Sequence, residues 1–418
     1  MNRPKPTPIQ LEFLNYEMGM FFHFGIRTFN EDNRDWDLLP MDPSTFDPKE
    51  LDCDQWIAAA KRAGARYAIM TTKHHDGFAL WPSAYTDFSV KASPWKGGKG
   101  DVVREFTDAC RRGGLKVGLY YSTSQFDAPA RNDSYDDFLI GQITELLTNY
   151  GKIDLLWFDG CGSTNRTFDR ERIAAALKDI YPAIVSGGFG RNDTRWIGNE
   201  WGHAPMSNVN LQNGVFSPGE CDGCMTRINA ENFWFYNDTY NDYRRTPDEL
   251  VNMYYLSVGR GANLLLNVAP DRRGLIQDED VRLLSLMKDE IDRRLHSCMI
   301  HTPAFEKLTD PKDGHLIFRV VLPVSHLVDH VVMEEDLTDG DHIYAFSIRS
   351  KPYENPSMDI EMYRGGTVGH KAICRFPTIR TRCIEVHVTE GDPEAVLKSL
   401  RLLYVGESSS LGNPQARL

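Results

Sequence analysis

The chain has 418 residues, of which 41% are hydrophobic and 25% charged, values typical of globular proteins. Its 59 acidic residues outnumber the 47 basic ones and give a net charge of −12, which disfavours nucleic acid as a partner, because phosphate binding needs clustered lysine and arginine. No apolar run reaches the roughly 18 residues of a membrane span, and the first residues lack a signal-peptide core. We therefore expect no membrane partner and a cytoplasmic location, or an extracytoplasmic one if a leader has been removed.

Short apolar runs alternate with amphipathic segments through the first 300 residues, a pattern typical of successive β–α units around a parallel sheet. The expected strands are Met18–Phe24, Tyr67–Thr72, Val117–Tyr121, Ile153–Asp159, Ala183–Ser186, Arg195–Asn199 and Asn263–Val268. The expected helices are Gln55–Ala63, Val102–Arg112, Tyr135–Tyr150, Arg170–Ile180 and Pro247–Gly259, with Asp101 and Thr246 as helix caps. An eighth strand is hidden between Trp201 and Arg245 or partly lost, so we expect an irregular (β/α)8-like barrel.

The pattern changes after an expected helix at Glu279–Leu295. Runs with a period of two then predict a C-terminal β-sandwich; they are His315–Leu322, Asp341–Arg349 and Arg382–Thr389. We place the catalytic barrel at residues 1–303 and the sandwich at residues 304–418. The few aromatic residues of the sandwich favour a structural role for it over glycan binding, because they suffice to fill its own core.

Eight cysteines in a chain of this length do not form a dense disulfide framework, and free thiols are expected. Cys221 and Cys224 form a single CxxC motif without a second pair. We interpret this motif as part of a loop rather than as a zinc or redox site.

Polar residues close several of the expected strands, where barrel enzymes carry their catalytic groups. His23, the pair His74 and His75, and Asp159 each follow an apolar run. Side chains alternate along a strand, so Trp157 shares a face with Asp159, and Leu119 shares one with Tyr121. The adjacent histidines can bind sugar hydroxyls, ligate a metal ion together with His23 or Asp159, or have a structural role.

Five segments in this order and spacing resemble glycoside hydrolase family 29, the α-L-fucosidases. They are Met20–Gly25, Thr71–Ser83, Gly118–Ser122, Leu156–Gly160 and Asn263–Asp271. The resemblance covers roughly residues 10–300 and implies a double-displacement mechanism without metal or organic cofactor, in which Asp159 is the nucleophile. It also implies that fucose contacts His23, His74, His75, Tyr121 and Trp157. Trp36 is expected to join them, although Asp35 stands before it where the family usually has glutamate.

Retention of configuration requires a second carboxyl group roughly 5–5.5 Å from the nucleophile, and it acts first as acid and then as base. Glu200, Glu220 and Glu231 are the candidates. Glu200 is favoured, because the segment Gly198–Gly202 is similar to the subgroup that prefers branched α-1,3/1,4-fucosides. Glu220 otherwise binds sugar or orients a loop. The acid/base should have a raised pKa, since burial and a neighbouring carboxylate both disfavour its charge.

The expected partner is a fucosylated oligosaccharide or glycoconjugate, with the loops at residues 124–134 and 202–243 on the side of the leaving group. Two other functions remain open. One is a fucose-binding pseudoenzyme without turnover. The other is a metal-dependent barrel hydrolase that uses His74, His75, His203 and Asp159.

Overall fold

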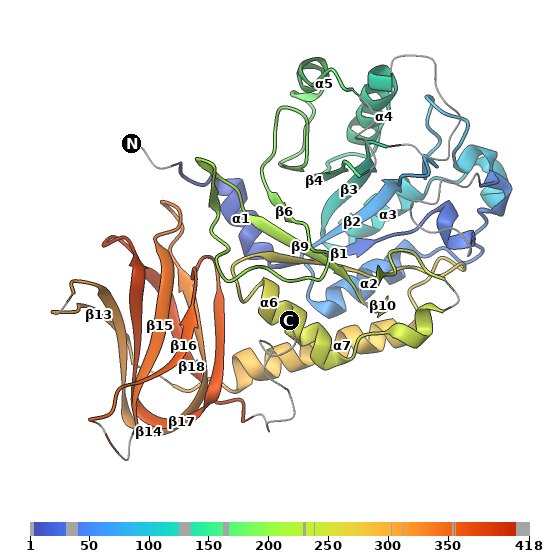
Figure 1. Ribbon diagram of the computed structural model, residues 1–418. Helices are drawn as coiled ribbons and strands as arrows, with labels where there is room; N and C mark the ends of the chain where they lie inside the picture. The colour runs from blue at the N-terminus through green and yellow to red at the C-terminus, as the bar shows by residue number, and fades with distance from the viewer. Residues whose placement is uncertain are drawn as a thin grey trace.

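The structure is a computed structural model that describes residues 4–30, 41–124, 135–161, 167–228, 231–237, 239–301, 303–311, 313–352, 355 and 357–406. A barrel-like domain holds the first part of the chain, and an antiparallel β domain follows it (Figure 1). No helix in the described ranges is long and apolar enough to cross a membrane.

Eight parallel strands form the central sheet of the barrel, in the order β5-β4-β3-β2-β1-β12-β9-β6. Their bounds are β1 Met18–Phe22, β2 Tyr67–Lys73, β3 Lys116–Ser122, β4 Leu155–Asp159, β5 Ile184–Ser186, β6 Arg195–Ile197, β9 Gly219–Cys224 and β12 Asn263–Asn267. A β-bridge joins Ser186 of edge strand β5 to Thr194, the residue before edge strand β6. The sheet is therefore a nearly closed barrel. Its eighth strand, β9, lies between Trp201 and Arg245, the stretch predicted to contain this strand or to have partly lost it.

Six of the helices in the described part of the chain agree closely with the expected ranges, and α1 was not predicted. The helices are α1 Pro8–Tyr16, α2 Cys53–Ala63, α3 Val102–Gly113, α4 Tyr135–Asn149, α5 Arg170–Leu177, α6 Pro247–Ser257 and α7 Asp278–Asp292, which a π-helical turn at Arg293–Ser297 continues. Asp101 accepts a hydrogen bond from the backbone of Arg104 and so caps α3. Thr246 forms a capping box with Glu249 at the start of α6. Both predicted caps are confirmed, because each side chain satisfies a backbone N–H that the first helical turn leaves free.

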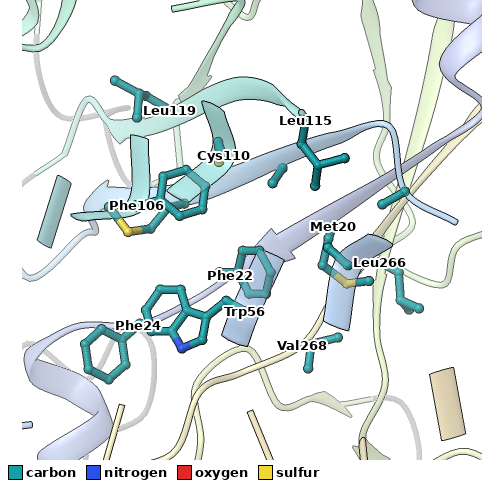
Figure 2. Packing of buried hydrophobic residues seen from close by; sticks show 14 of the residues in the cluster. Met20, Phe22, Phe24, Trp56, Phe106, Cys110, Leu115, Leu119, Leu266 and Val268 are labelled. Atoms are coloured by element: carbon teal, nitrogen blue, oxygen red, sulfur yellow. The ribbon is translucent and has the colours of Figure 1, made fainter. Parts of the chain in front are cut away.

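The alternation of side chains along β1 separates two apolar layers. Met20 and Phe22 point outward to the helices, where Phe22 packs against Trp56 of α2 and Phe106 of α3 (Figure 2). Phe21 points into the barrel and belongs to a smaller interior cluster. The barrel interior is thus a packed layer of aromatic residues beneath its C-terminal end.

The C-terminal domain is an antiparallel sheet with the order β13-β14-β17-β15-β16, in which β18 also pairs with β14. Its strands are β13 Glu306–Thr309, β14 Leu316–Glu335, β15 Ile343–Pro352, β16 Ile360–Gly365, β17 Ala372–Gly391 and β18 Leu397–Leu403. Register shifts interrupt the pairing of β14 with β17. Such irregularities bend long strands and let one sheet enclose its own core, as in the predicted β-sandwich.

The two domains share buried surface. Val332, Ile373 and Leu403 of the β domain belong to the apolar cluster of the barrel. Glu17, which lies between α1 and β1, accepts hydrogen bonds from Tyr254 and from Lys371 of the β domain. Burial alone would raise the pKa of Glu17, but its contacts with His370 and Lys371 outweigh burial and lower this pKa to about 2.

Cys221 and Cys224 lie on β9 and not in a loop, so the interpretation of this motif as loop was wrong. The spacing of three places them on opposite faces of the strand. Cys221 packs with Ile197 outside the barrel, whereas Cys224 lies beside Asn267. All eight cysteines are free thiols.

Short hairpins complete the region between β6 and α6. They are formed by β7 Leu211–Gln212 with β8 Val215–Phe216, and by β10 Arg227–Ile228 with β11 Glu231–Asn232.

Candidate active site

Asp159 is the last residue of β4, and both of its carboxylate oxygens accept a hydrogen bond. Oδ2 accepts one from the hydroxyl of Tyr120 at 2.8 Å, and Oδ1 accepts one from the backbone N–H of Cys161 at 2.7 Å. Nε2 of His75 lies 3.6 Å from Oδ2. The carboxylate is held in place but is still partly open to solvent, with 23% of its side chain exposed.

Tyr120, and not Tyr121, faces this carboxylate. The register of β3 and β4 pairs Tyr120 with Trp157, and their rings are stacked with centroids 5.5 Å apart. Tyr121 points to the outer layer, where its hydroxyl donates to Oε1 of Gln142 at 2.7 Å. The prediction that Tyr121 lines the site was therefore wrong. Leu119 and Tyr121 do share a face, but it is the face toward the helices.

Three histidines gather above the aromatic layer. His23 follows β1, and His74 and His75 follow β2. The ring centroids of His23 and His74 are 5.5 Å apart, and those of His74 and His75 are 4.1 Å apart. The chain curls at the end of β2, so the structure brings the adjacent histidines to the same site as Asp159. Trp234 and Phe235 pack against His23 and complete this wall.

All three imidazoles are neutral near pH 7. Burial lowers the pKa of His23 to about 3 and that of His74 well below its usual range. Burial also lowers the pKa of His75 to about 4, against the opposing charge of Asp159. A neutral imidazole offers one donor and one acceptor, which suits a sugar hydroxyl.

Asn267 at the end of β12 decides the tautomer of His23. The amide nitrogen of Asn267 donates to the carbonyl of Trp234 at 2.9 Å, so its oxygen faces Nδ1 of His23 at 2.8 Å. Nδ1 therefore carries the hydrogen, and Nε2 is left as an acceptor. The hydroxyl of Ser122 lies 2.7 Å from Nδ1 of His75 and orients this ring.

Glu200 lies in the loop that follows β6. Its backbone is in the left-handed region, with φ of 55°, which costs an L-residue roughly 1–2 kcal/mol. The loop is tied to β9, because the N–H of Gly202 donates to the carbonyl of Asp222 at 2.7 Å. Burial and the nearby charge of Asp159 raise the pKa of Glu200. Strained backbone and a perturbed carboxyl group are features of functional sites.

Glu220 lies in the barrel interior beneath this layer. It is the second residue of β9 and is almost fully buried. Its Oε1 accepts a hydrogen bond from the hydroxyl of Tyr67, and its Oε2 accepts one from the indole of Trp157 at 3.0 Å. Burial raises its pKa to about 7. With both oxygens engaged by protein groups, Glu220 supports Trp157 from below, and the geometry does not favour the predicted direct sugar contact.

Asp222 is a site residue that the sequence analysis did not select. It lies on β9 two residues after Glu220, is 3% exposed, and accepts a hydrogen bond from the indole of Trp196 at 2.9 Å. Burial raises its pKa to about 8, and nearby Glu200 and Glu220 add to this effect against the opposing hydrogen bond. The alternation of two acids in Gly219–Cys224 was the signal for an inward strand face.

Trp36 lies outside the described residues, as does the side chain of Glu231.

Within the described ranges, no three histidine, cysteine, aspartate or glutamate side chains are grouped so as to hold a metal ion. Nδ1 of His23 and Nδ1 of His75 are directed at Asn267 and Ser122. The ring of His203 packs against Trp201.

A family model described as alpha-L-fucosidase matches residues 3–289. The chain belongs to the α-L-fucosidase family. Alpha-L-fucosidase 1 of Arabidopsis thaliana is 29% identical over 462 aligned positions, which cover 98% of this chain and 89% of the plant protein. The crystal structure of a glycoside hydrolase family 29 member from an unknown rumen bacterium is 30% identical, with a TM-score of 0.86. That alignment covers 99% of this chain and 79% of the bacterial one.

Other relatives in the family are longer than the matched region. A protein of Oryza sativa subsp. japonica is 36% identical over 306 residues, which are 67% of this chain and 57% of the rice protein.

Proposed function

We propose that this protein is a retaining α-L-fucosidase that releases terminal α-linked L-fucose through a fucosyl-enzyme on Asp159. The observation that carries the proposal is the position of Asp159 at the end of β4. There Tyr120 and the backbone of Cys161 hold its carboxylate beside three neutral histidines. The family supports fucose as the sugar, and the geometry supplies the groups for each step.

In the first step, a carboxylate oxygen of Asp159 attacks the anomeric carbon while the bond to the glycosidic oxygen breaks. Glu200 donates its proton to the departing oxygen, so the leaving sugar departs as an alcohol. The raised pKa of Glu200 suits this role, because a general acid must still hold its proton near the working pH.

In the second step, the ionised Glu200 takes a proton from water, and the water oxygen attacks the anomeric carbon. The bond to Asp159 breaks, and its carboxylate is restored while Glu200 regains its proton. Two inversions at one carbon give net retention.

Glu200 is the better acid/base candidate than Glu220. Glu220 is held below Trp157 by two donors, whereas Glu200 follows β6 and responds to the charge of Asp159. A group that alternates between acid and base must reach both the glycosidic oxygen and water. The environment of Glu220 leaves it no such access.

The linkage that we propose is α-1,3 or α-1,4 in Lewis-type glycans. The segment Gly198–Gly202 around Glu200 supports this choice through its similarity to the corresponding subgroup. Assays on Lewis-type, 2′-linked and core-fucosylated oligosaccharides test it directly. Preferential release from the 2′-linked or core-fucosylated substrate would overturn the linkage.

Replacement of Asp159 tests the mechanism. Asp159→Asn should abolish hydrolysis of an aryl α-L-fucoside without loss of fold. Asp159→Gly with added azide should yield the β-fucosyl azide, because the anion enters the space of the nucleophile. Wild-type turnover in Asp159→Asn, or an α-azide from Asp159→Gly, would refute the role of Asp159.

Replacement of the acid/base tests the assignment of Glu200. Glu200→Ala should release almost no fucose from a Lewis-type trisaccharide, because this poor leaving group needs a general acid. The variant should still form the fucosyl-enzyme from an activated aryl fucoside. Azide should then trap the intermediate as the α-fucosyl azide. If Glu220→Ala showed both the selective loss on the trisaccharide and the trapping by azide, and Glu200→Ala showed neither, Glu220 would be the acid/base instead.

The same experiments separate the other two functions. A fucose-binding pseudoenzyme would bind fucose without turnover of any of these substrates. A metal-dependent hydrolase would lose activity with a chelator and regain it with metal.

A further inference from the structure

Trp196 exposes an aromatic surface beside the candidate site. It is the middle residue of β6, and 45% of its surface is exposed. Its ring lies edge-on to Trp157, with centroids 6.2 Å apart. The indole therefore presents an apolar face to solvent next to the candidate site, while its N–H needs a hydrogen-bond partner.

The orientation of this ring is fixed from below. The indole N–H of Trp196 donates to Oδ1 of Asp222 at 2.9 Å, and Asp222 is itself 3% exposed. The polar edge of the ring is thereby satisfied inside the protein, and only its apolar faces remain for contact. The hydrogen bond to Asp222 thereby fixes the direction in which the exposed ring projects.

Asp222 also anchors the loop that carries Glu200. Its side chain holds Trp196, and its backbone carbonyl accepts the N–H of Gly202 at 2.7 Å. Both ends of the segment 196–202 are therefore attached to one residue of β9. Glu200 lies within that segment, in its strained left-handed conformation.

We propose that Trp196 is the platform for the sugar attached to fucose, and that Asp222 is the positioning residue that holds this platform beside Glu200. The occupant is a pyranose ring, whose C–H groups on one face suit the electron-rich face of an indole. This inference rests on the proposed function, because the platform is defined relative to the bond that Glu200 protonates. Trp157 and Trp196 would then contact successive sugars on the two sides of that bond.

The test compares two substrates that share fucose and differ in the leaving group. α-L-Fucosyl fluoride places no ring on Trp196, whereas a Lewis-type trisaccharide does. Trp196→Ala should lower the ratio of kcat/KM for the trisaccharide to that for the fluoride by about 10-fold or more, as for other aromatic anchors. The loss should come mainly from KM. Trp201→Ala, which removes a second exposed tryptophan of the same loop, is the matched control and should change this ratio by less than about threefold.

Variants of Asp222 test the anchor. Asp222→Asn retains an oxygen acceptor for the indole and should keep the ratio close to that of the wild type. Asp222→Leu removes the acceptor and should lower the ratio as Trp196→Ala does. If the leucine variant does not fold, Trp196→Phe replaces it, because phenylalanine keeps a ring but cannot donate a hydrogen bond to Asp222. Trp196→Phe should lower the ratio of kcat/KM for the trisaccharide to that for the fluoride, but by less than Trp196→Ala does.

The outcomes separate this inference from the proposed function. Failure of the wild type to hydrolyse the fluoride would refute the fucosidase itself. Wild-type activity together with an unchanged ratio in Trp196→Ala, or a larger fall in Trp201→Ala, would overturn the platform alone. An equal loss in Asp222→Asn and Asp222→Leu would overturn the anchoring role.

Discussion

The two adjacent tyrosines of β3 allow a direct test of how the site is built. Tyr120→Phe removes only the hydroxyl that donates to Oδ2 of Asp159 at 2.8 Å. The ring remains, together with its stacking on Trp157 and on His74. Tyr121→Phe makes the same chemical change one residue later, on the face toward the helices.

The size of the effect follows from the kind of bond that is lost. A hydrogen bond to a charged group contributes about 1.5–3 kcal/mol. The Asp159 side chain is 23% exposed, so water can replace part of the lost interaction. We therefore expect Tyr120→Phe to lose about 1.5–2 kcal/mol of transition-state stabilisation, which is a fall of about 10- to 30-fold in kcat/KM.

Tyr121→Phe should affect stability and not activity. It leaves Oε1 of buried Gln142 without the hydroxyl that donates to it, which costs about 1–3 kcal/mol. Its kcat/KM should stay within about twofold of the wild type, since its side chain points away from Asp159.

The assay is kcat/KM on an aryl α-L-fucoside for both variants, with urea unfolding of each monitored in parallel. A greater loss of activity in Tyr121→Phe than in Tyr120→Phe would refute the assigned directions of these side chains. Equal loss in both variants would also refute them.

Three further predictions concern buried polar groups. Asn267→Asp places a carboxylate against Nδ1 of His23 and should raise the pKa of His23, so the acid limb of the kcat/KM profile should move toward neutral pH; an unmoved limb would show that the state of His23 is irrelevant to activity. The raised pKa of Asp222 means that the folded protein holds a proton that the unfolded chain releases, so the wild type should lose stability as pH rises from about 4 to about 8. Melting temperatures across this window should fall less for Asp222→Asn, and parallel curves would contradict the buried, protonated state. The pKa of Glu17 falls from 4.5 to about 2, so it should contribute about 3 kcal/mol above pH 4.5 that is lost as pH falls toward 2. The free energy of unfolding of Glu17→Gln, measured in urea, should lack this pH dependence. A loss of stability in acid equal to that of the wild type would contradict the lowered pKa of Glu17.

Much of the barrel could be predicted because its local signals are strong. Apolar runs of five to seven residues with polar ends correspond to β1 to β4, and Asp159 lies at the end of β4 as expected. Strand β9 was harder to locate. Its residues Gly219–Cys224 are polar and glycine-rich, and they become a strand because β12 and β6 bond to them on both sides.

Local sequence does not decide whether Tyr120 or Tyr121 points into the barrel. The alternation of side chains follows from the strand itself, so Leu119 and Tyr121 necessarily share a face. Which face is inward depends on the register with neighbouring strands, and the pairing of β2 with β3 shifts between Thr71 and Lys73. The local sequence Leu-Tyr-Tyr-Ser does not determine that register.

The sequence by itself thus determined the order of the elements, the strand ends and the residue types of the site, because hydrophobic periodicity and capping are local properties. The tertiary structure decided which of these side chains contact one another. Closure of the barrel placed both oxygens of Glu220 against Tyr67 and Trp157 and brought Asp222 to the indole of Trp196. It also set Glu200 close enough to Asp159 for that charge to raise its pKa, because the distance between residues 41 positions apart depends on the packing of separate strands and not on either segment alone.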